Sequence, residues 1–426
     1  MLPYQNPQGE IPAGFKVFKE RMERPVKTLQ HRAVRNLDLF LTVSLFGILS
    51  FLFLFLVFGE KAALWLAMDH NFDWQFSDYF RHVVYASDLR QLYFNTNDAS
   101  FPPLAYLFYH LVYRLHPMEL PVMLESWQIL GRDPFHLFVF LIRTSLLLFF
   151  LYPVLKRFLR ASDWHTALLW CCIVFSTPFL AGAVERGNSV LLVVLLLLSA
   201  LSCMGDPSPK VRELALLLFS LAACIKIYPA IFILLYVKEK RWREAARFVL
   251  YSALLFLLPF VFAGGFEGFV QYLRVLLSLG NTSYTRWTDV KSFFLAIMQQ
   301  LGSDPSDLLT GVGKGLSFAV LFAMLFSFFR THCRYREIML LSGICSVFVS
   351  NSYRYTACYM AIALLAFLKE QNANGKLYAV LFGFIFTIPF FAYFGNLNPD
   401  FFLFVPIYLL LLICMVDIQK EKAGVA

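Results

Sequence analysis

Long apolar runs recur along the chain from Leu37 to Ile418, and this repetition limits the possible folds more than any other feature. Several runs reach the roughly 20 residues that a membrane-spanning helix needs. They lack the apolar–polar alternation that a membrane β-barrel requires. Only 15% of the residues are charged, well below the usual share in soluble domains. The sequence therefore predicts an all-α, polytopic helical membrane protein.

Lysine and arginine in short loops set the predicted orientation, because cytoplasmic loops are enriched in these residues. Basic clusters occur at 16–35, 156–160, 238–247, 330–336, 369–376 and 420–422. Counting crossings back from the tail places the polar segments 59–101, 185–188, 264–311 and 351–354 on the external side. We predict a multi-pass protein of the bacterial inner membrane with both termini cytoplasmic, and a first helix that is retained as an anchor.

The predicted organisation has three parts. A basic cytoplasmic segment covers 1–37, a single integral-membrane domain covers 38–418, and a cytoplasmic tail covers 419–426. The domain carries a long first external loop over 59–101 and a second large external segment over 264–311 that contains short helices. The net charge of +9 comes from the basic loops, so nucleic-acid binding is not expected. Most of the eight cysteines lie within apolar runs and none has metal-ligand spacing.

Two apolar stretches are predicted to form broken helices. In 213–237 the sequence CIKIYPAIF places Lys226 just before Pro229, and proline disfavours a continuous helix there. Residues 102–131 contain a similar interruption at His116-Pro117. Non-helical backbone at membrane depth is tolerated where protein or a water-filled cavity surrounds it. The total becomes about 12–14 transmembrane or half-membrane helices.

The unusual polar residues gather on the predicted external side. The first loop carries Asp69, Asp73, Asp78, Asp88 and Asp98, and cations stand at Arg186, Lys226 and Arg354. Cations near a helix break can hold a phosphate, and a facing carboxylate can deprotonate a hydroxyl nucleophile. This pattern suits a substrate with an anionic head and an apolar tail.

Structural interpretations of the same residues stay open. Lys226 could reach the interface with its ammonium while its stem is buried. Glu185 and Arg186 could form an ion pair that caps a helix starting at Asn188. Arg354 could stack on a neighbouring tyrosine.

Five segments in this order resemble the signatures of glycosyltransferase family 87, which belongs to the GT-C superfamily of membrane enzymes. They are FSDYF at 76–80, FPPLAYLFY at 101–109, VERGNSVLLVVLLLL at 184–198, IKIYPAIFILLYVKEKRWR at 225–243 and NSYRYTACYMAIALL at 351–365. The resemblance covers most of 38–370. It implies a GT-C-like fold and an inverting transfer of sugar from a polyprenyl phosphate.

The resemblance also implies roles for individual residues. Asp78, at the start of the loop's first amphipathic helix, is the general base, with Asp73 or Asp69 as alternatives. Lys226 contacts the donor phosphate, and Arg354 and Arg186 are candidates for a second contact. The other expected substrate-binding residues are Tyr79, Asn188 and Tyr228. No paired acidic motif stands in the loop, so we expect metal-independent chemistry without a cofactor.

The expected function is transfer of a hexose, most simply mannose, at the external face of the membrane. The acceptor would be a lipid-linked glycan or polysaccharide precursor, and membrane lipids would be the other partners. One alternative is a transporter or flippase of lipid-linked saccharides, for which broken helices are also expected. Another is a non-catalytic subunit of an envelope-assembly complex.

Overall fold

The computed structural model describes residues 36–50, 76–95, 99–117, 133–159, 177–280, 288–304, 306–349, 354–370, 375–386 and 399–422, with a few single positions between 52 and 59. Within these ranges the regular structure is helical and no strand occurs, which confirms the predicted all-α polytopic fold. The predicted cytoplasmic segment up to residue 35, the loop over 60–75 and the second half-helix over 118–132 lie outside them.

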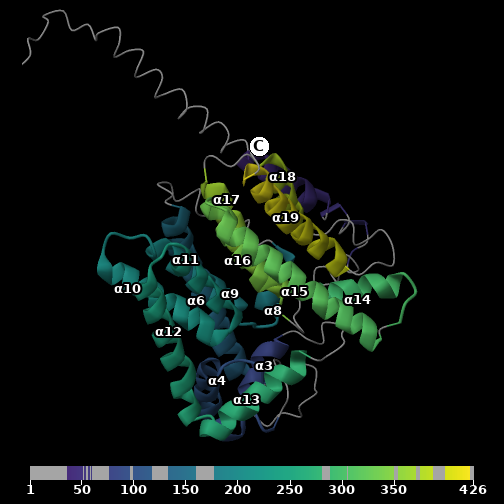
Figure 1. The fold of residues 1–426 in the computed structure, drawn as a ribbon. Helices are drawn as coiled ribbons and strands as arrows, with labels where there is room; N and C mark the ends of the chain where they lie inside the picture. Colours follow the sequence, from purple (N-terminus) through teal and green to yellow (C-terminus); the bar gives the residue numbers. More distant parts are fainter. Residues whose placement is uncertain are drawn as a thin grey trace, which may run out of the picture.

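The described helices follow one another in this order along the chain. A helix without a label in Figure 1 covers Asn36–Ser50. The next elements are α3 (Ser77–Tyr85), η1 (Leu89–Gln91), α4 (Pro103–Leu115), α6 (Pro134–Leu159), α8 (Pro178–Glu185), α9 (Val190–Cys203), α10 (Pro209–Ile225), η2 (Tyr228–Phe232) and α11 (Ile233–Lys238). The remaining elements are α12 (Trp242–Leu257), η3 (Leu258–Val261), α13 (Gly265–Gly280), α14 (Val290–Gln300), α15 (Asp307–Arg330), α16 (Arg334–Val347), η4 (Arg354–Tyr359), α17 (Met360–Lys369), α18 (Lys376–Phe386) and α19 (Pro399–Lys422).

The predicted helix break at Lys226 is present. Helix α10 ends at Ile225, Lys226 adopts an extended conformation with φ −140° and ψ 129°, and a 3-10 turn follows before α11. Pro229 lies in that turn, where it has no N–H to donate to a continuous helix. Helix α4 likewise ends at Leu115, two residues before Pro117. The short helices expected within 264–311 are α13 and α14.

Four described helices are long and apolar enough to cross a membrane. They are Pro134–Leu159, Trp242–Val261, Asp307–Arg330 and Leu403–Glu421. Large apolar side chains stay exposed on their outer faces, for example Phe149, Leu254 and Phe322. Exposed apolar surface of this extent marks a protein that lies in lipid. Four shorter apolar helices accompany them: Asn36–Ser50, Val190–Cys203, Tyr228–Lys238 and Lys376–Phe386.

Two buried cores organise the molecule. The larger core packs aliphatic side chains of α9, α10 and α16 to α19. The smaller one, here called the aromatic cluster, joins α3, α4 and α6 to η3 and α13 through Tyr79, Phe80, Tyr93, Tyr106, Tyr109, Phe140, Phe260 and Tyr272. Figure 1 shows α3, α4 and α13 together at the lower end of the molecule, with α17, α18 and α19 toward the upper end.

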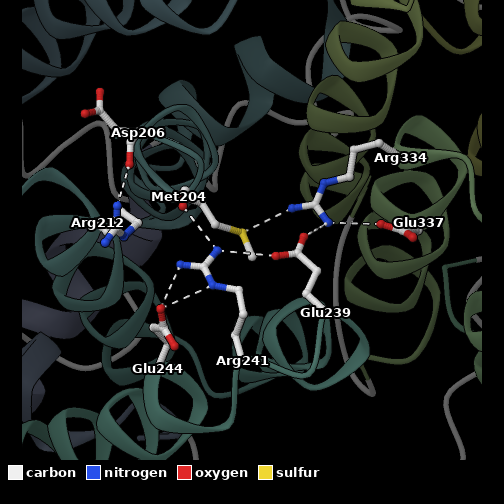
Figure 2. A network of polar contacts seen from close by, with 8 residues as sticks. All are labelled: Met204, Asp206, Arg212, Glu239, Arg241, Glu244, Arg334 and Glu337. Carbon is white, nitrogen blue, oxygen red and sulfur yellow. Dashed lines mark hydrogen bonds and ion pairs between the residues drawn. The ribbon is translucent and has the colours of Figure 1, made fainter. Parts of the chain in front are cut away.

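A polar network joins three helix ends (Figure 2). Arg241 donates to Glu244 at 3.2 Å and to Glu239 at 3.3 Å. Arg334 donates to the same Glu239 at 2.9 Å and to Glu337 at 3.0 Å. The network therefore links the turn between α11 and α12 to the start of α16.

This network and the aromatic cluster lie at opposite ends of one candidate span. The 20-residue helix Trp242–Val261 begins beside Arg241 and ends with Phe260, a member of the aromatic cluster. A helix of that length measures about 30 Å, the thickness of a bilayer core. The basic stretch 238–247 and the first-loop helix α3 thus lie near opposite ends of this helix. Which side is cytoplasmic stays a prediction.

Candidate active site

The turn between α8 and α9 is built around Gly187. Its φ is +68°, a left-handed conformation that favours glycine. A Cβ atom there would lie 2.7 Å from Tyr79 Cβ and 2.9 Å from the Phe140 ring. The carbonyl of Gly187 accepts a hydrogen bond of 3.0 Å from Arg143 Nη1 of α6. The glycine in the ERGN sequence thus lets α3 and α6 approach this turn closely.

Helix α3 is docked onto the same turn by its backbone. The N–H of Phe76 donates to the Glu185 carbonyl at 2.7 Å, and those of Asp78 and Tyr79 donate to the Arg186 carbonyl at 3.1 and 3.2 Å. The first N–H groups of a helix have no partner within the helix, so these bonds satisfy donors that would otherwise be unpaired. The turn therefore fixes both the position and the direction of α3.

The Asp78 carboxylate is held by two side chains of the turn. Arg186 donates to Oδ1 through Nη2 at 3.0 Å and Nε at 3.2 Å. Asn188 donates to Oδ2 through Nδ2 at 2.7 Å, while its own Oδ1 accepts the N–H of Val190 at 2.9 Å. All three side chains are buried, and Arg186 is only 2% exposed. Three of the residues predicted from sequence thus form one hydrogen-bonded group.

The surroundings keep Asp78 ionised. Burial raises the pKa of the Asp78 carboxyl, but the charge and hydrogen bonds of Arg186, with smaller effects of His82 and Asn188, outweigh burial. The resulting pKa lies below the ordinary value of an aspartate. Asp78 therefore carries its negative charge throughout the physiological pH range.

His82 lies one turn further along α3, on the same face as Asp78. It is buried, and its ring centroid lies 4.5 Å from that of Phe101 and 5.3 Å from that of Tyr109. Its Nδ1 has no hydrogen-bond partner among the residues that the structure describes. Burial lowers the pKa of His82 to about 3, so the imidazole is neutral. His82 is not among the residues predicted from the sequence, although its four-residue spacing from Asp78 could have indicated it.

Lys226 is enclosed by aromatic rings at the break after α10. Its Nζ lies 4.6 Å from the ring centroid of Phe101, 5.4 Å from that of Tyr355 and 5.8 Å from that of Tyr228. Ring faces stabilise a cation, more so where water is excluded. The residue is 5% exposed, which does not fit the alternative of an ammonium in water at the interface. Within the described ranges no carboxylate forms an ion pair with Lys226.

Phe101 connects the two halves of the site. Its ring contacts both the imidazole of His82 and the ammonium of Lys226. The first-loop helix, which carries Asp78, therefore meets the broken helix, which carries Lys226, across a single aromatic side chain. This places the predicted carboxylate and the predicted phosphate contact in one region of the fold.

The structure also places the other predicted residues. Tyr79 is fully buried in the aromatic cluster, with its ring centroid 5.6 Å from that of Phe140. The Tyr228 ring packs edge-on against Tyr359 at 5.4 Å. Arg354 is buried at the start of η4, directly before Tyr355, whose ring faces Lys226.

Helix η4, which carries Arg354, packs against α8, the helix that leads into the Gly187 turn. The Sγ of Cys358 in η4 donates to the Phe179 carbonyl of α8 at 3.4 Å. Asp69 and Asp73, the alternative bases, lie outside the described residues. In the described part of the chain, histidine, cysteine and carboxylate side chains form no group of three that could hold a metal ion.

Comparison with known proteins identifies the family. The family model of glycosyltransferase family 87 matches residues 130–351, just over half of the 426-residue chain. The match includes the ERGN turn and the Lys226 break, while the Asp78 segment precedes it. No curated protein and no solved structure matches the chain. The chain belongs to glycosyltransferase family 87 and is a membrane glycosyltransferase.

Proposed function

We propose that the protein transfers a hexose, most simply mannose, from a polyprenyl phosphate to a lipid-linked glycan or polysaccharide precursor at the external face of the membrane. The observation that carries this proposal is the buried Lys226 ammonium, which faces aromatic rings and forms no ion pair with a described carboxylate, although the charge of Asp78 acts on it from a longer distance. A buried cation is costly unless a counter-charge is present. The donor phosphate supplies that counter-charge.

In this proposal Lys226 and Arg354 bind the phosphate, and Tyr228 and Tyr355 shape its surroundings. Arg186 and Asn188 orient Asp78 instead of contacting the donor, because the hydrogen bonds between these side chains and the carboxylate favour that role. Tyr79 supports the position of α3 from inside the aromatic cluster. The polyprenyl chain remains in the bilayer.

The reaction is an inverting substitution at the anomeric carbon. The bond between that carbon and the phosphate oxygen breaks, and its electron pair leaves on the phosphate beside Lys226. The acceptor oxygen attacks the opposite face of the sugar, and its proton passes to the Asp78 carboxylate. Asp78 is a weak base, but the acceptor proton becomes strongly acidic as the new carbon–oxygen bond forms. A carboxylate held beside the acceptor hydroxyl is therefore a strong enough base to take this proton, because positioning makes the step effectively unimolecular.

The test is transfer of radiolabelled sugar from polyprenyl-phosphate mannose or glucose to a lipid-acceptor extract by the purified protein. Asp78→Asn should abolish transfer, whereas Asp88→Asn, in the same loop, should retain it. Lys226→Met should raise the KM for the donor by at least about tenfold, the effect of one lost charge contact worth roughly 1.4 kcal/mol. Lys210→Met, at the other end of α10, is the matched control.

If Asp78→Asn retained sugar transfer, the role of general base would be assigned to Asp73 or Asp69 instead. If the folded wild-type protein transferred sugar from neither donor, the transporter or assembly-subunit alternatives would replace the proposed function.

A further inference from the structure

The imidazole of His82 is buried beside the group around Asp78 without a hydrogen bond. The residue is 6% exposed, and its Nδ1 is sealed from solvent. Neither ring nitrogen hydrogen-bonds to a residue within the described ranges. Buried polar groups are normally hydrogen-bonded, because a donor or acceptor without a partner costs free energy. A ligand that hydrogen-bonds to this ring would remove that cost.

Packing alone does not require a nitrogen-containing ring at this position. Aromatic rings surround the imidazole, with centroid distances of 4.5 Å to Phe101, 5.3 Å to Tyr109, 5.5 Å to Tyr106 and 6.2 Å to Tyr85. A phenylalanine ring would pack among them without the cost of burying polar atoms. His136, which is also buried, differs because its Nε2 contacts the His116 carbonyl at 3.0 Å. The nitrogens of His82 therefore point to a ligand.

His82 neighbours both the predicted base and the predicted phosphate contact. It stands one helical turn after Asp78 on α3. The ring of Phe101, which packs on the imidazole, also lies 4.6 Å from Nζ of Lys226. The charge of Asp78 raises the pKa of His82, and the charge of Lys226 lowers it. Both charged groups thus lie within electrostatic range of the imidazole.

The geometry of an inverting transfer determines what lies beside such a residue. The base activates the acceptor on one face of the sugar ring, and the leaving group departs from the opposite face. The sugar therefore lies between the phosphate contact and the base, and a side chain close to both meets its hydroxyl groups. Burial keeps the imidazole neutral, so it offers one N–H donor and one acceptor nitrogen. A sugar hydroxyl can pair with either nitrogen.

We propose that His82 hydrogen-bonds to one hydroxyl group of the transferred sugar and thereby contributes to the choice of sugar. This inference rests on the proposed function, in which Lys226 binds the phosphate and Asp78 takes the acceptor proton. A sugar that lacks this hydroxyl would leave the buried imidazole unpaired. A site built to hydrogen-bond a substrate hydroxyl rejects such an analogue strongly. His82 is thus a substrate-binding residue that acts on the sugar and not on the lipid phosphate.

The experiment compares two phosphodiesters of equal charge, one with a sugar and one without. The ligands are polyprenyl-phosphate mannose or glucose, whichever the wild type binds more tightly, and polyprenyl methyl phosphate. Native mass spectrometry measures their binding to the purified full-length protein without an acceptor. His82→Phe should reduce the preference for the glycosylated lipid about tenfold, the value of one hydrogen bond, and His82→Gln should retain part of it. Lys226→Met should weaken the binding of both lipids. One deoxy derivative of the sugar should bind equally to wild type and His82→Phe.

Two controls separate sugar binding from packing. The midpoint of thermal unfolding of His82→Phe at pH 7 should be no lower than that of the wild type, and His332→Phe, at an exposed position before α16, should keep the preference. An unchanged preference in folded His82→Phe, or an equal loss of both lipids, would overturn this inference and leave the proposed function in place. If the wild type bound neither lipid, both proposals would be overturned.

Discussion

The amide of Asn188 lies 2.7 Å from Oδ2 of Asp78, although the two residues stand 110 positions apart in the chain. The same amide side chain accepts the N–H of Val190 through its oxygen, so its orientation is fixed from both ends. An asparagine held in this way keeps the carboxylate in one rotamer. We therefore treat Asn188 as a positioning residue for Asp78.

Replacing Asn188 by alanine should leave Oδ2 of Asp78 without a buried donor. The expected loss of unfolding free energy is about 1–3 kcal/mol, and kcat should fall more than the KM for the donor changes. Thermal unfolding and sugar-transfer kinetics of Asn188→Ala measure both effects. Unchanged kcat in a folded Asn188→Ala protein would contradict a positioning role.

The ion pair between Arg186 and Asp78 should show strong coupling. Removing one partner leaves the other charge buried and unpaired, so Arg186→Met should destabilise the protein by about 3–5 kcal/mol. The double variant Arg186→Met/Asp78→Asn should recover part of that loss, because no unpaired charge remains. Thermal unfolding of the wild type, the two single variants and the double variant gives a double-mutant cycle, which measures the coupling between the two side chains. A double variant that loses the full sum of the single effects would show that the two side chains do not interact.

Gly187 should be sensitive to the smallest substitution. Gly187→Ala combines a left-handed backbone with contacts of 2.7 Å to Tyr79 Cβ and 2.9 Å to the Phe140 ring. We expect a loss of about 1–3 kcal/mol and a large fall in transfer, since α3 can no longer approach the turn. Gly205→Ala is the control, because a Cβ atom there meets nothing within 4 Å. Equal unfolding midpoints for the two variants would rule out this explanation.

His82 should make the stability of the protein depend on pH. The charged groups that influence its pKa, besides burial, are Asp78, Lys226, Arg81 and Arg143. The pKa of His82 is about 3 in the folded protein and about 6.5 in an unfolded chain. Between these values the unfolded chain binds the extra proton, so the stability is complete above pH 6.5 and falls as the pH decreases toward 3.

The slope from this histidine is at most about 1.4 kcal/mol per pH unit. His82→Gln should therefore lose less stability than the wild type between pH 7 and pH 5, as measured by thermal unfolding in the same detergent. His110→Gln, on α4, provides a histidine control. Parallel pH profiles for wild type and His82→Gln would contradict the assignment of this effect to His82.

Several features of the fold follow from local sequence signals. Pro229 predicts the interruption after Lys226, and the structure has extended backbone at that lysine. The resemblance to the family places Asp78 at the start of the first-loop helix, and α3 begins one residue earlier, at Ser77. Such features depend on residues that are close in the chain, so a single sequence contains them.

The partners of Asp78 could not be predicted in the same way. The sequence predicts substrate contacts for Arg186 and Asn188, and it offers Glu185 as an ion-pair partner of Arg186. The pairing with Asp78 depends on how α3 docks onto a turn more than 100 residues away, which no local pattern encodes. The 3-10 segment η4 before α17 was also not predicted, because NSYRYTACY contains no proline to mark it.

The docking of α3 onto the α8–α9 turn relies on main-chain atoms: the N–H groups of Phe76, Asp78 and Tyr79 and the carbonyls of Glu185 and Arg186. Main-chain groups are the same in every amino acid except proline. The position of the Asp78 carboxylate therefore does not depend on most of the side chains at the docking positions. Gly187 is the exception. Relatives could alter the residues that meet their own sugars and acceptors around this joint and still present a carboxylate at the same point in space.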